Sequence, residues 1–226
     1  MHLFETFFRV MSVKAPRDGV SGFHFDFHKS ITCPKITTQD SYYASKLATY
    51  GFGIHSGATG ITTTYIWPES VASKNPDSLL SCIYYHSTRV EQDNMGWNIF
   101  WADNARFQNK NYTVALFLEH LVESGIRRRI DYKFFVSGHS YGAVDRDAGR
   151  CEKLIRREEV LECPADYREL INESSLHPKT HWIELDQSNF KNYSTFKEES
   201  YFFLSFSLLT IFMQLMLFAI SPLHQK

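Results

Sequence analysis

Carboxylates are the side chains of this sequence best suited to catalysis. Asp26 and Asp103 lie far apart in the chain, and Asp145, Asp147 and Glu152 follow later. Carboxylates that are brought together repel one another unless cations neutralise them, and their hard oxygen atoms suit Mg²⁺ or Mn²⁺. Two such ions activate a water or hydroxyl and stabilise the leaving oxygen in phosphodiester cleavage or strand transfer. The competing interpretation is that aspartates at strand ends act as caps and turn formers.

We therefore predict a Mg²⁺ or Mn²⁺ site at which Asp26, Asp103, Asp145 and Asp147 are the catalytic candidates. The predicted metal ligands are Asp26, Asp103 and Asp147. The sequence leaves open whether Asp145, Asp147 or Glu152 supplies the third carboxylate.

Two histidines, His24 and His28, flank Asp26 in a segment that alternates between phenylalanine and polar residues. A period of two places His24, Asp26 and His28 on one face of a strand and the phenylalanines on the other. A His-x-Asp-x-His strand could ligate a transition metal directly. Histidines in such positions are more often ordinary surface or core groups, which is the interpretation that we favour.

A different chemistry is suggested by the segment Gly138-His139-Ser140-Tyr141-Gly142, which has the G-x-S-x-G form of a hydrolase nucleophile elbow. The residues that could complete a catalytic triad are Asp166 or Asp186 and His177 or His181. The elbow requires a helix directly after it, and Asp145-Arg146-Asp147 makes a poor first turn. No HGGG-like oxyanion loop precedes the serine. A serine hydrolase is therefore the second interpretation.

Polar and basic residues lie close to these carboxylates in the sequence. Asn104, Gln108, Asn109 and Lys110 follow Asp103 and could grip a phosphate or a base edge near a helix N-terminus. A capping loop rich in Asn and Gln is the alternative. Further along, the segment between residues 126 and 157 contains nine positive and four negative residues. The positive residues are Arg127, Arg128, Arg129, Lys133, Arg146, Arg150, Lys153, Arg156 and Arg157, and the negative residues are Asp131, Asp145, Asp147 and Glu152. This segment is either a phosphate-backbone patch or a solvated face.

The elements that must position these residues follow from the hydrophobic pattern. Period-two or buried apolar runs predict strands at 23–28, 49–55, 61–67, 97–103 and 133–137, with a possible edge strand at 181–185. Helices are expected from Pro76, over 112–124, over 150–159 and over 166–172. Three antiparallel strands followed by two helix-linked strands is the order of an α/β fold of the ribonuclease-H-like type, with a mixed five-stranded sheet and flanking helices. In that order the first and fourth strands are neighbours, so Asp26 and Asp103 would meet.

Composition sets the limits of these predictions. The chain of 226 residues has 24 Lys and Arg against 25 Asp and Glu, a net charge of −1, which argues against a polybasic, coat-like nucleic-acid binder. Four scattered cysteines predict reduced, mostly buried thiols in an intracellular protein. We expect one domain over residues 20–193. Tyr201–Ile220 is uncharged over 20 residues and, as a helix, would be about 30 Å long. It is either a membrane anchor or sequence without a selected role.

A family resemblance joins these motifs. The motifs that carry it are Phe25-Asp26-Phe27-His28-Lys29, Ala102-Asp103-Asn104 with Gln108-Asn109-Lys110-Asn111, and Ser137-Gly138-His139-Ser140 with Asp145-Arg146-Asp147. In this order and spacing they resemble a domain family of multicopy, transposable-element-derived proteins of animal genomes, from about Gly22 to Tyr193.

The resemblance implies a ribonuclease-H-like transposase domain that acts on DNA in the nucleus. Its carboxylate positions fall on Asp26, Asp103 and either Asp145 or Asp147. His139 joins Asn104, Gln108, Asn109 and Lys110 as a predicted nucleic-acid-binding residue. The alternative within the same family is a domesticated binding module that has no catalytic activity.

Overall fold

The fold was obtained as a computed structural model of the chain, in which residues 19–36, 46–91, 96–105, 108–135, 142–173 and 180–193 are described. The strands are β1 (Val20–Phe27), β2 (Ile31–Cys33), β3 (Leu47–Ser56), β4 (Thr62–Pro68), β5 (Trp97–Ala102), β6 (Arg129–Phe134) and β7 (Thr180–Glu184). The helices are α3 (Pro76–Tyr85), α4 (Tyr112–Glu123), α5 (Ala143–Arg157) and α6 (Pro164–Glu173), with a π-helical turn η2 (His86–Val90) and a 3₁₀ turn η3 (Gln187–Asn189).

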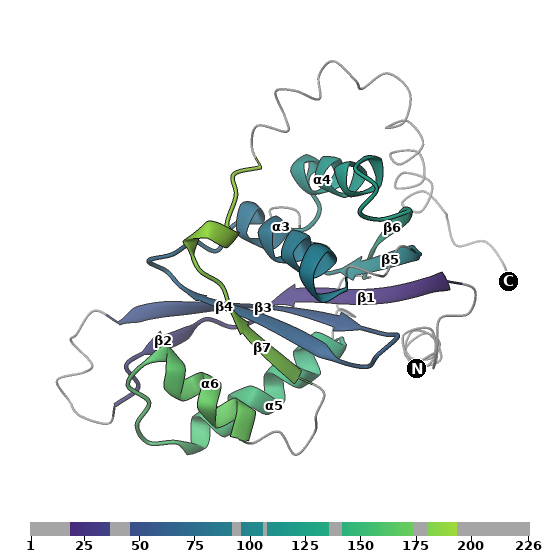
Figure 1. The fold of residues 1–226 in the computed structure, drawn as a ribbon. Helices are drawn as coiled ribbons and strands as arrows, with labels where there is room; N and C mark the ends of the chain where they lie inside the picture. Colours follow the sequence, from purple (N-terminus) through teal and green to yellow (C-terminus); the bar gives the residue numbers. More distant parts are fainter. Residues whose placement is uncertain are drawn as a thin grey trace, which may run out of the picture.

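One mixed sheet organises the fold, with the strand order β6-β5-β1-β3-β4-β7 and β2 paired to β3 (Figure 1). β1, β3 and β4 form an antiparallel meander, whereas β5 runs parallel to β1 and β6 runs parallel to β5. Two antiparallel steps leave β4 parallel to β1. The strands β1, β4, β5 and β6 therefore finish at the same end of the sheet, which we call the carboxyl end. Because α3, α4 and α5 follow β4, β5 and β6, these helices begin near that end.

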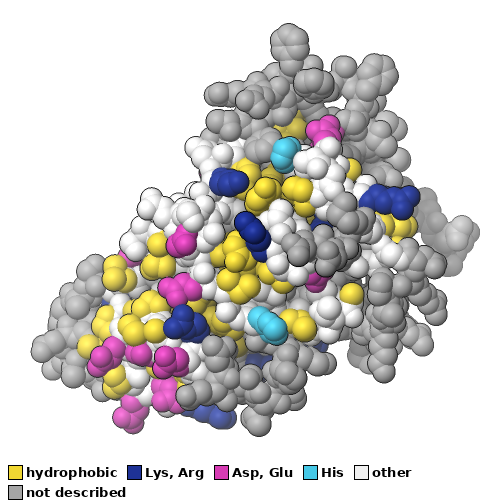
Figure 2. All heavy atoms as spheres, viewed as in Figure 1, with side chains coloured by type: hydrophobic (Ala, Val, Ile, Leu, Met, Phe, Trp, Pro, Cys, Tyr) yellow, Lys and Arg dark blue, Asp and Glu magenta, His cyan; other side chains and the backbone are white. Residues whose placement is uncertain are grey.

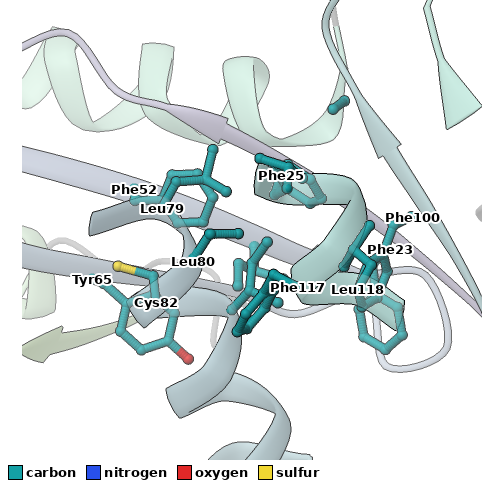
Figure 3. Packing of buried hydrophobic residues seen from close by; sticks show 14 of the residues in the cluster. Phe23, Phe25, Phe52, Tyr65, Leu79, Leu80, Cys82, Phe100, Phe117 and Leu118 are labelled. Atoms are coloured by element: carbon teal, nitrogen blue, oxygen red, sulfur yellow. The ribbon is translucent and has the colours of Figure 1, made fainter. Parts of the chain in front are cut away.

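Helices cover both faces of the sheet: α3 and α4 lie on one face, and α5 and α6 lie on the other (Figure 1). The alternation along β1 separates these two layers. Phe23 and Phe25 are buried against the α3 and α4 side, where Leu80 and Phe117 also pack (Figure 3). His24 contacts the start of α5 on the opposite side. Burying each phenylalanine stabilises the fold by roughly 2–3 kcal/mol, so the sheet cannot slip by one residue without a large loss.

Side-chain caps fix where two of the helices begin. Asn75 caps α3 by accepting a hydrogen bond from the Ser78 backbone N–H at 2.9 Å, and Ser78 Oγ in turn accepts from the Asn75 N–H at 3.1 Å. Asn111 caps α4 by accepting from the Val114 N–H at 3.1 Å. Gly125 follows α4 with φ of 72°, a left-handed conformation that favours glycine. The polar residues between strand and helix therefore act as helix start signals.

The prediction of a mixed α/β sheet with neighbouring first and fourth strands is confirmed, because β1 pairs with β5. The prediction of five strands was wrong, since the described residues form seven. The additional strands are β2, which is only three residues long, and β7, which lies at the sheet edge where the possible edge strand was expected. α5 begins at Ala143 rather than at residue 150, and β6 begins at Arg129 because it pairs with β5 from Trp97 onward.

The four cysteines are free thiols, and three of them (Cys33, Cys82 and Cys151) are buried, as predicted. None of the helices in the described ranges is long and apolar enough to cross a membrane. The predicted apolar helix Tyr201–Ile220 lies outside the described residues.

Candidate active site at the carboxyl end of the sheet

Strand register brings the two most distant carboxylates together. In the parallel pair of β1 and β5, His24 lies beside Trp101. Two residues further along each strand, the same register places Asp26 beside Asp103. Asp103 is the first residue after β5, so its side chain lies at the carboxyl end of the sheet.

Asp145 joins this pair from the first turn of α5. Burial, and after it the charges of Asp103 and Asp145, together raise the pKa of the Asp26 carboxyl to about 7. A 2.7 Å hydrogen bond from the Phe27 N–H to Asp26 Oδ1 acts in the opposite direction. Burial also raises the pKa of the Asp145 carboxyl, whereas a 2.7 Å hydrogen bond from the Gly142 N–H lowers it. The three carboxylates thus form one electrostatically coupled group, which we call the carboxylate triad.

Asp103 is held by the polar segment that follows it. The Asn109 side-chain amide donates a hydrogen bond to Asp103 Oδ1, and the Ala105 N–H donates to the same oxygen at 3.3 Å. The hydroxyl of Tyr132 donates to the Asn109 carbonyl at 2.9 Å and so fixes that residue from β6. Asn109, which the sequence predicts to bind nucleic acid, is buried, and its amide orients the Asp103 carboxylate.

The other residues of this segment differ from Asn109. Asn104 and Lys110 are exposed, and the Lys110 ammonium lies 5.3 Å from the centre of the Phe134 ring. The backbone carbonyl of Gln108 accepts a hydrogen bond from Asn111. Asn104 and Lys110 are therefore available to contact a ligand, whereas Asn109 orients the Asp103 carboxylate.

Asp147, also predicted as a ligand, lies in a separate polar cluster. Its Oδ2 accepts a hydrogen bond from Thr62 Oγ1 at 2.5 Å and lies 3.8 Å from His55 Nδ1. Arg150 pairs with Oδ1 at 3.2 Å. Asp147 is buried, and these contacts tie α5 to β3 and β4. Glu152, the third alternative, pairs with Lys29 at 3.3 Å and with Arg156 at 3.0 Å. The geometry thus favours Asp145 as the third carboxylate.

Of the two histidines beside Asp26, His24 contacts the start of α5, whereas His28 lies against Gly51 and Gly53 of β3. His24 Nδ1 accepts a 3.4 Å hydrogen bond from the Val144 N–H, and its ring packs edge-on against Phe135. Burial lowers the pKa of His24 to about 3 and that of His28 to about 4, so both are neutral at physiological pH. Their arrangement supports the favoured interpretation of ordinary packing groups over that of a transition-metal site.

One residue near the carboxylate triad was not found from the sequence. Lys74 lies just before α3, and its ammonium donates a 3.0 Å hydrogen bond to the His28 carbonyl. The same ammonium lies 5.0 Å from the centre of the Phe27 ring, and its charge lowers the pKa of Asp26. The local sequence around Lys74 shows only a helix start, Asn75-Pro76, which gives no sign that a neighbouring lysine reaches another strand.

The predicted basic patch is divided in the structure. Arg127 is 1% exposed and donates to the Glu91 carbonyl at 2.9 Å, so it belongs to the interior. Arg129 stacks on Trp97 with its guanidinium 3.8 Å from the ring centre. Figure 2 shows lysine and arginine side chains scattered over one face, while acidic side chains gather toward the end where α6 lies. On that face the positive residues do not form one continuous patch.

Two further predictions, the roles of His139 and Ser140 and the presence of a metal site, can be compared with the structure only within the described residues. His139 and Ser140 lie outside the described residues, so the hydrolase nucleophile and one predicted nucleic-acid contact are not placed. Among the residues that the structure does describe, no group of three or more His, Cys, Asp and Glu side chains is arranged as a ready metal-binding set.

The fold and the carboxylate triad define a mixed α/β domain with an acidic site at the carboxyl end of its sheet. The family model of a domain of unknown function, DUF7869, matches residues 39–201, more than half of the chain, and the protein belongs to this family. Asp103 and Asp145 lie within the matched residues, whereas Asp26 precedes them. A search of the curated proteins gave no match.

The electrostatic coupling between the aspartates predicts that Asp145, and not Asp147, is the third member of the carboxylate triad. Asp145→Asn should lower the pKa of Asp26 from about 7 toward its ordinary value, because a neighbouring negative charge is removed. Asp147→Asn on the same helix is the matched control and should leave the pKa of Asp26 unchanged. Carbon-13 NMR titration of the Asp26 carboxyl measures both. An equal decrease in the two variants would contradict the assignment of Asp145.

Proposed function

We propose that this protein is a metal-dependent, DNA-directed phosphodiesterase of the transposase type, which cleaves or transfers DNA strands. The observation that carries the proposal is the carboxylate triad, in which Asp26, Asp103 and Asp145 come from three elements and interact at one end of the sheet. Acidic side chains that repel one another in this way are suited to binding divalent cations.

The strand order supports this class of fold. Within the sheet, the order β4-β3-β1-β5-β6 has the antiparallel meander on one side of β1 and two parallel, helix-linked strands on the other. This is the order expected of a ribonuclease-H-like domain, with β2 and β7 as additions. The resemblance to transposable-element-derived proteins agrees with it and suggests a nuclear location.

The carboxylate oxygens of Asp26, Asp103 and Asp145 are hard ligands of the type that Mg²⁺ and Mn²⁺ take. Burial and the nearby charges of Asp103 and Asp145 both disfavour ionisation of Asp26 and raise its pKa, and a bound divalent cation would favour the ionised carboxylate. Asp26, Asp103 and Asp145 would hold the ions, which when bound supply Lewis-acid activation of the attacking water and of the leaving oxygen. Asn109 keeps Asp103 oriented, and the Gly142 N–H keeps Asp145 oriented. The protein's own contribution is therefore to fix the carboxylate oxygens before metal and DNA arrive.

The proposal is tested by the nicking of supercoiled DNA with Mg²⁺ or Mn²⁺. Asp103→Asn should reduce nicking at least 100-fold, because it removes a charged ligand while the amide retains the shape of the side chain. Asp131→Asn on β6, whose carboxylate pairs with Arg129, is the matched control and should nick like the wild type. Equal nicking by all three proteins would exclude the carboxylate mechanism. Labelling of Ser140 by a fluorophosphonate probe would instead favour the serine hydrolase.

A further inference from the structure

Lys74 is a positively charged residue beside the carboxylate triad, and the proposed metal site gives it no role. Its side chain is half-buried, and its ammonium is held from two sides, by the His28 carbonyl at 3.0 Å and by the Phe27 ring at 5.0 Å. Both of these residues are close neighbours of Asp26 in the sequence. The ammonium is therefore fixed beside the end of β1, where Asp26 lies.

This ammonium retains binding capacity. An ammonium group has three N–H donors, and the hydrogen bond to His28 uses one of them. Lys74 forms no ion pair with a carboxylate of the described residues, although the charge of Asp26 acts on it. A partly desolvated cation with unused donors is suited to an anionic ligand.

A DNA strand at this site would be attracted by such a cation, in addition to the divalent ions of the proposed function. The phosphodiesters of DNA are negatively charged, and so are the carboxylates, so the strand is repelled unless positive charge lies between them. Lys110, beside Asn109, offers a second ammonium near the carboxyl end of the sheet and also lies over an aromatic ring. Of the two, Lys110 is exposed, whereas Lys74 is positioned by contacts to the backbone and to a ring.

We propose that Lys74 binds a phosphodiester of the DNA strand and positions it against the carboxylate triad, an inference that rests on the proposed function. A lysine that contacts one phosphate releases about one counterion on binding, so it makes the slope of log K against log salt concentration more negative by roughly 0.9. This slope can be measured without cleavage and without a divalent metal.

Fluorescence anisotropy of a labelled DNA duplex in EDTA, over a series of salt concentrations, measures this contribution with the full chain. Lys74→Gln keeps a donor for the His28 carbonyl but loses the charge, and should make the slope less negative by about one while weakening binding several-fold at low salt. Lys74→Arg should keep the slope. Lys29→Gln is the matched control, since Lys29 is exposed and pairs with Glu152. It should bind DNA with an unchanged slope.

The outcomes separate the two proposals. An unchanged slope in Lys74→Gln, or an equal change in Lys29→Gln, would overturn the role of Lys74. If Asp103→Asn nicks DNA like the wild type while Lys74→Gln makes the slope less negative, the phosphate contact stands and the nuclease mechanism fails. Thermal unfolding of each variant shows whether it is folded, and if Lys74→Gln is not, the same slope is measured with Lys74→Met.

Discussion

Gly142→Ala is expected to destabilise the protein by about 3 kcal/mol, at the upper end of the usual cost of overpacking. A Cβ atom at this position would lie 2.0 Å from Cε1 of His24 and 2.4 Å from its Nδ1. His24 cannot move away easily, because its ring is fully buried, packs against Phe135 and accepts the Val144 N–H. The start of α5 must therefore shift, and Asp145 would shift with it.

Gly149→Ala provides a control of opposite sign within the same helix. A Cβ atom at Gly149 meets nothing within 4 Å, so alanine should stabilise the helix by about 0.5–1 kcal/mol. Urea denaturation of both variants gives the two free energies of unfolding. If Gly142→Ala were as stable as Gly149→Ala, the close packing of α5 on His24 would be refuted.

The sequence pattern was sufficient for most of the strands and helices. The alternation along Phe23–His28 identified both faces of β1, and Pro76 located the start of α3. The pattern failed where an element is polar or short. The first residues of β6, Arg129 and Asp131 among them, show no apolar run, and that strand is specified by pairing with β5. The three residues of β2 carry too little pattern to be recognised.

The candidate site was predictable in its first two members only. Strand order alone predicts that Asp26 and Asp103 are neighbours. Asp145 and Asp147 are two residues apart, so on a helix their side chains point about 160° away from each other, and the helix phase decides which one joins the site. That phase depends on how Gly142 packs on His24, which is a tertiary contact. Lys74 was missed for the same reason, since only the folded chain brings it to β1.

The second large effect expected is a loss of stability in acid that is caused by His24. Its pKa is lowered to about 3 in the folded protein from an ordinary value of 6.5, because burial disfavours the charged ring. Below pH 6.5 the unfolded chain takes up a proton at this position while the folded protein does not, until the pH approaches 3. Between pH 6.5 and pH 4.5 this linkage costs roughly 2–3 kcal/mol of folding free energy.

Asp26 acts in the opposite direction over the same pH range. Its pKa is raised to about 7 in the folded protein, so the folded state binds a proton first and gains stability as the pH falls from 7 toward 4. A pH profile of the wild type alone therefore combines both effects. The contribution of His24 is isolated only by comparison with a variant that changes this residue and leaves Asp26 in place.

His24→Asn is that variant, because its Oδ1 replaces Nδ1 as the acceptor for the Val144 N–H but cannot titrate. Its free energy of unfolding, relative to the wild type, should improve by about 2–3 kcal/mol when the pH is lowered from 7 to 4.5. His181→Asn, at an exposed position on β7, is the matched control and should follow the wild-type profile. Urea denaturation at a series of pH values measures all three proteins. Parallel profiles for the wild type and His24→Asn would show that His24 is not held neutral beneath α5.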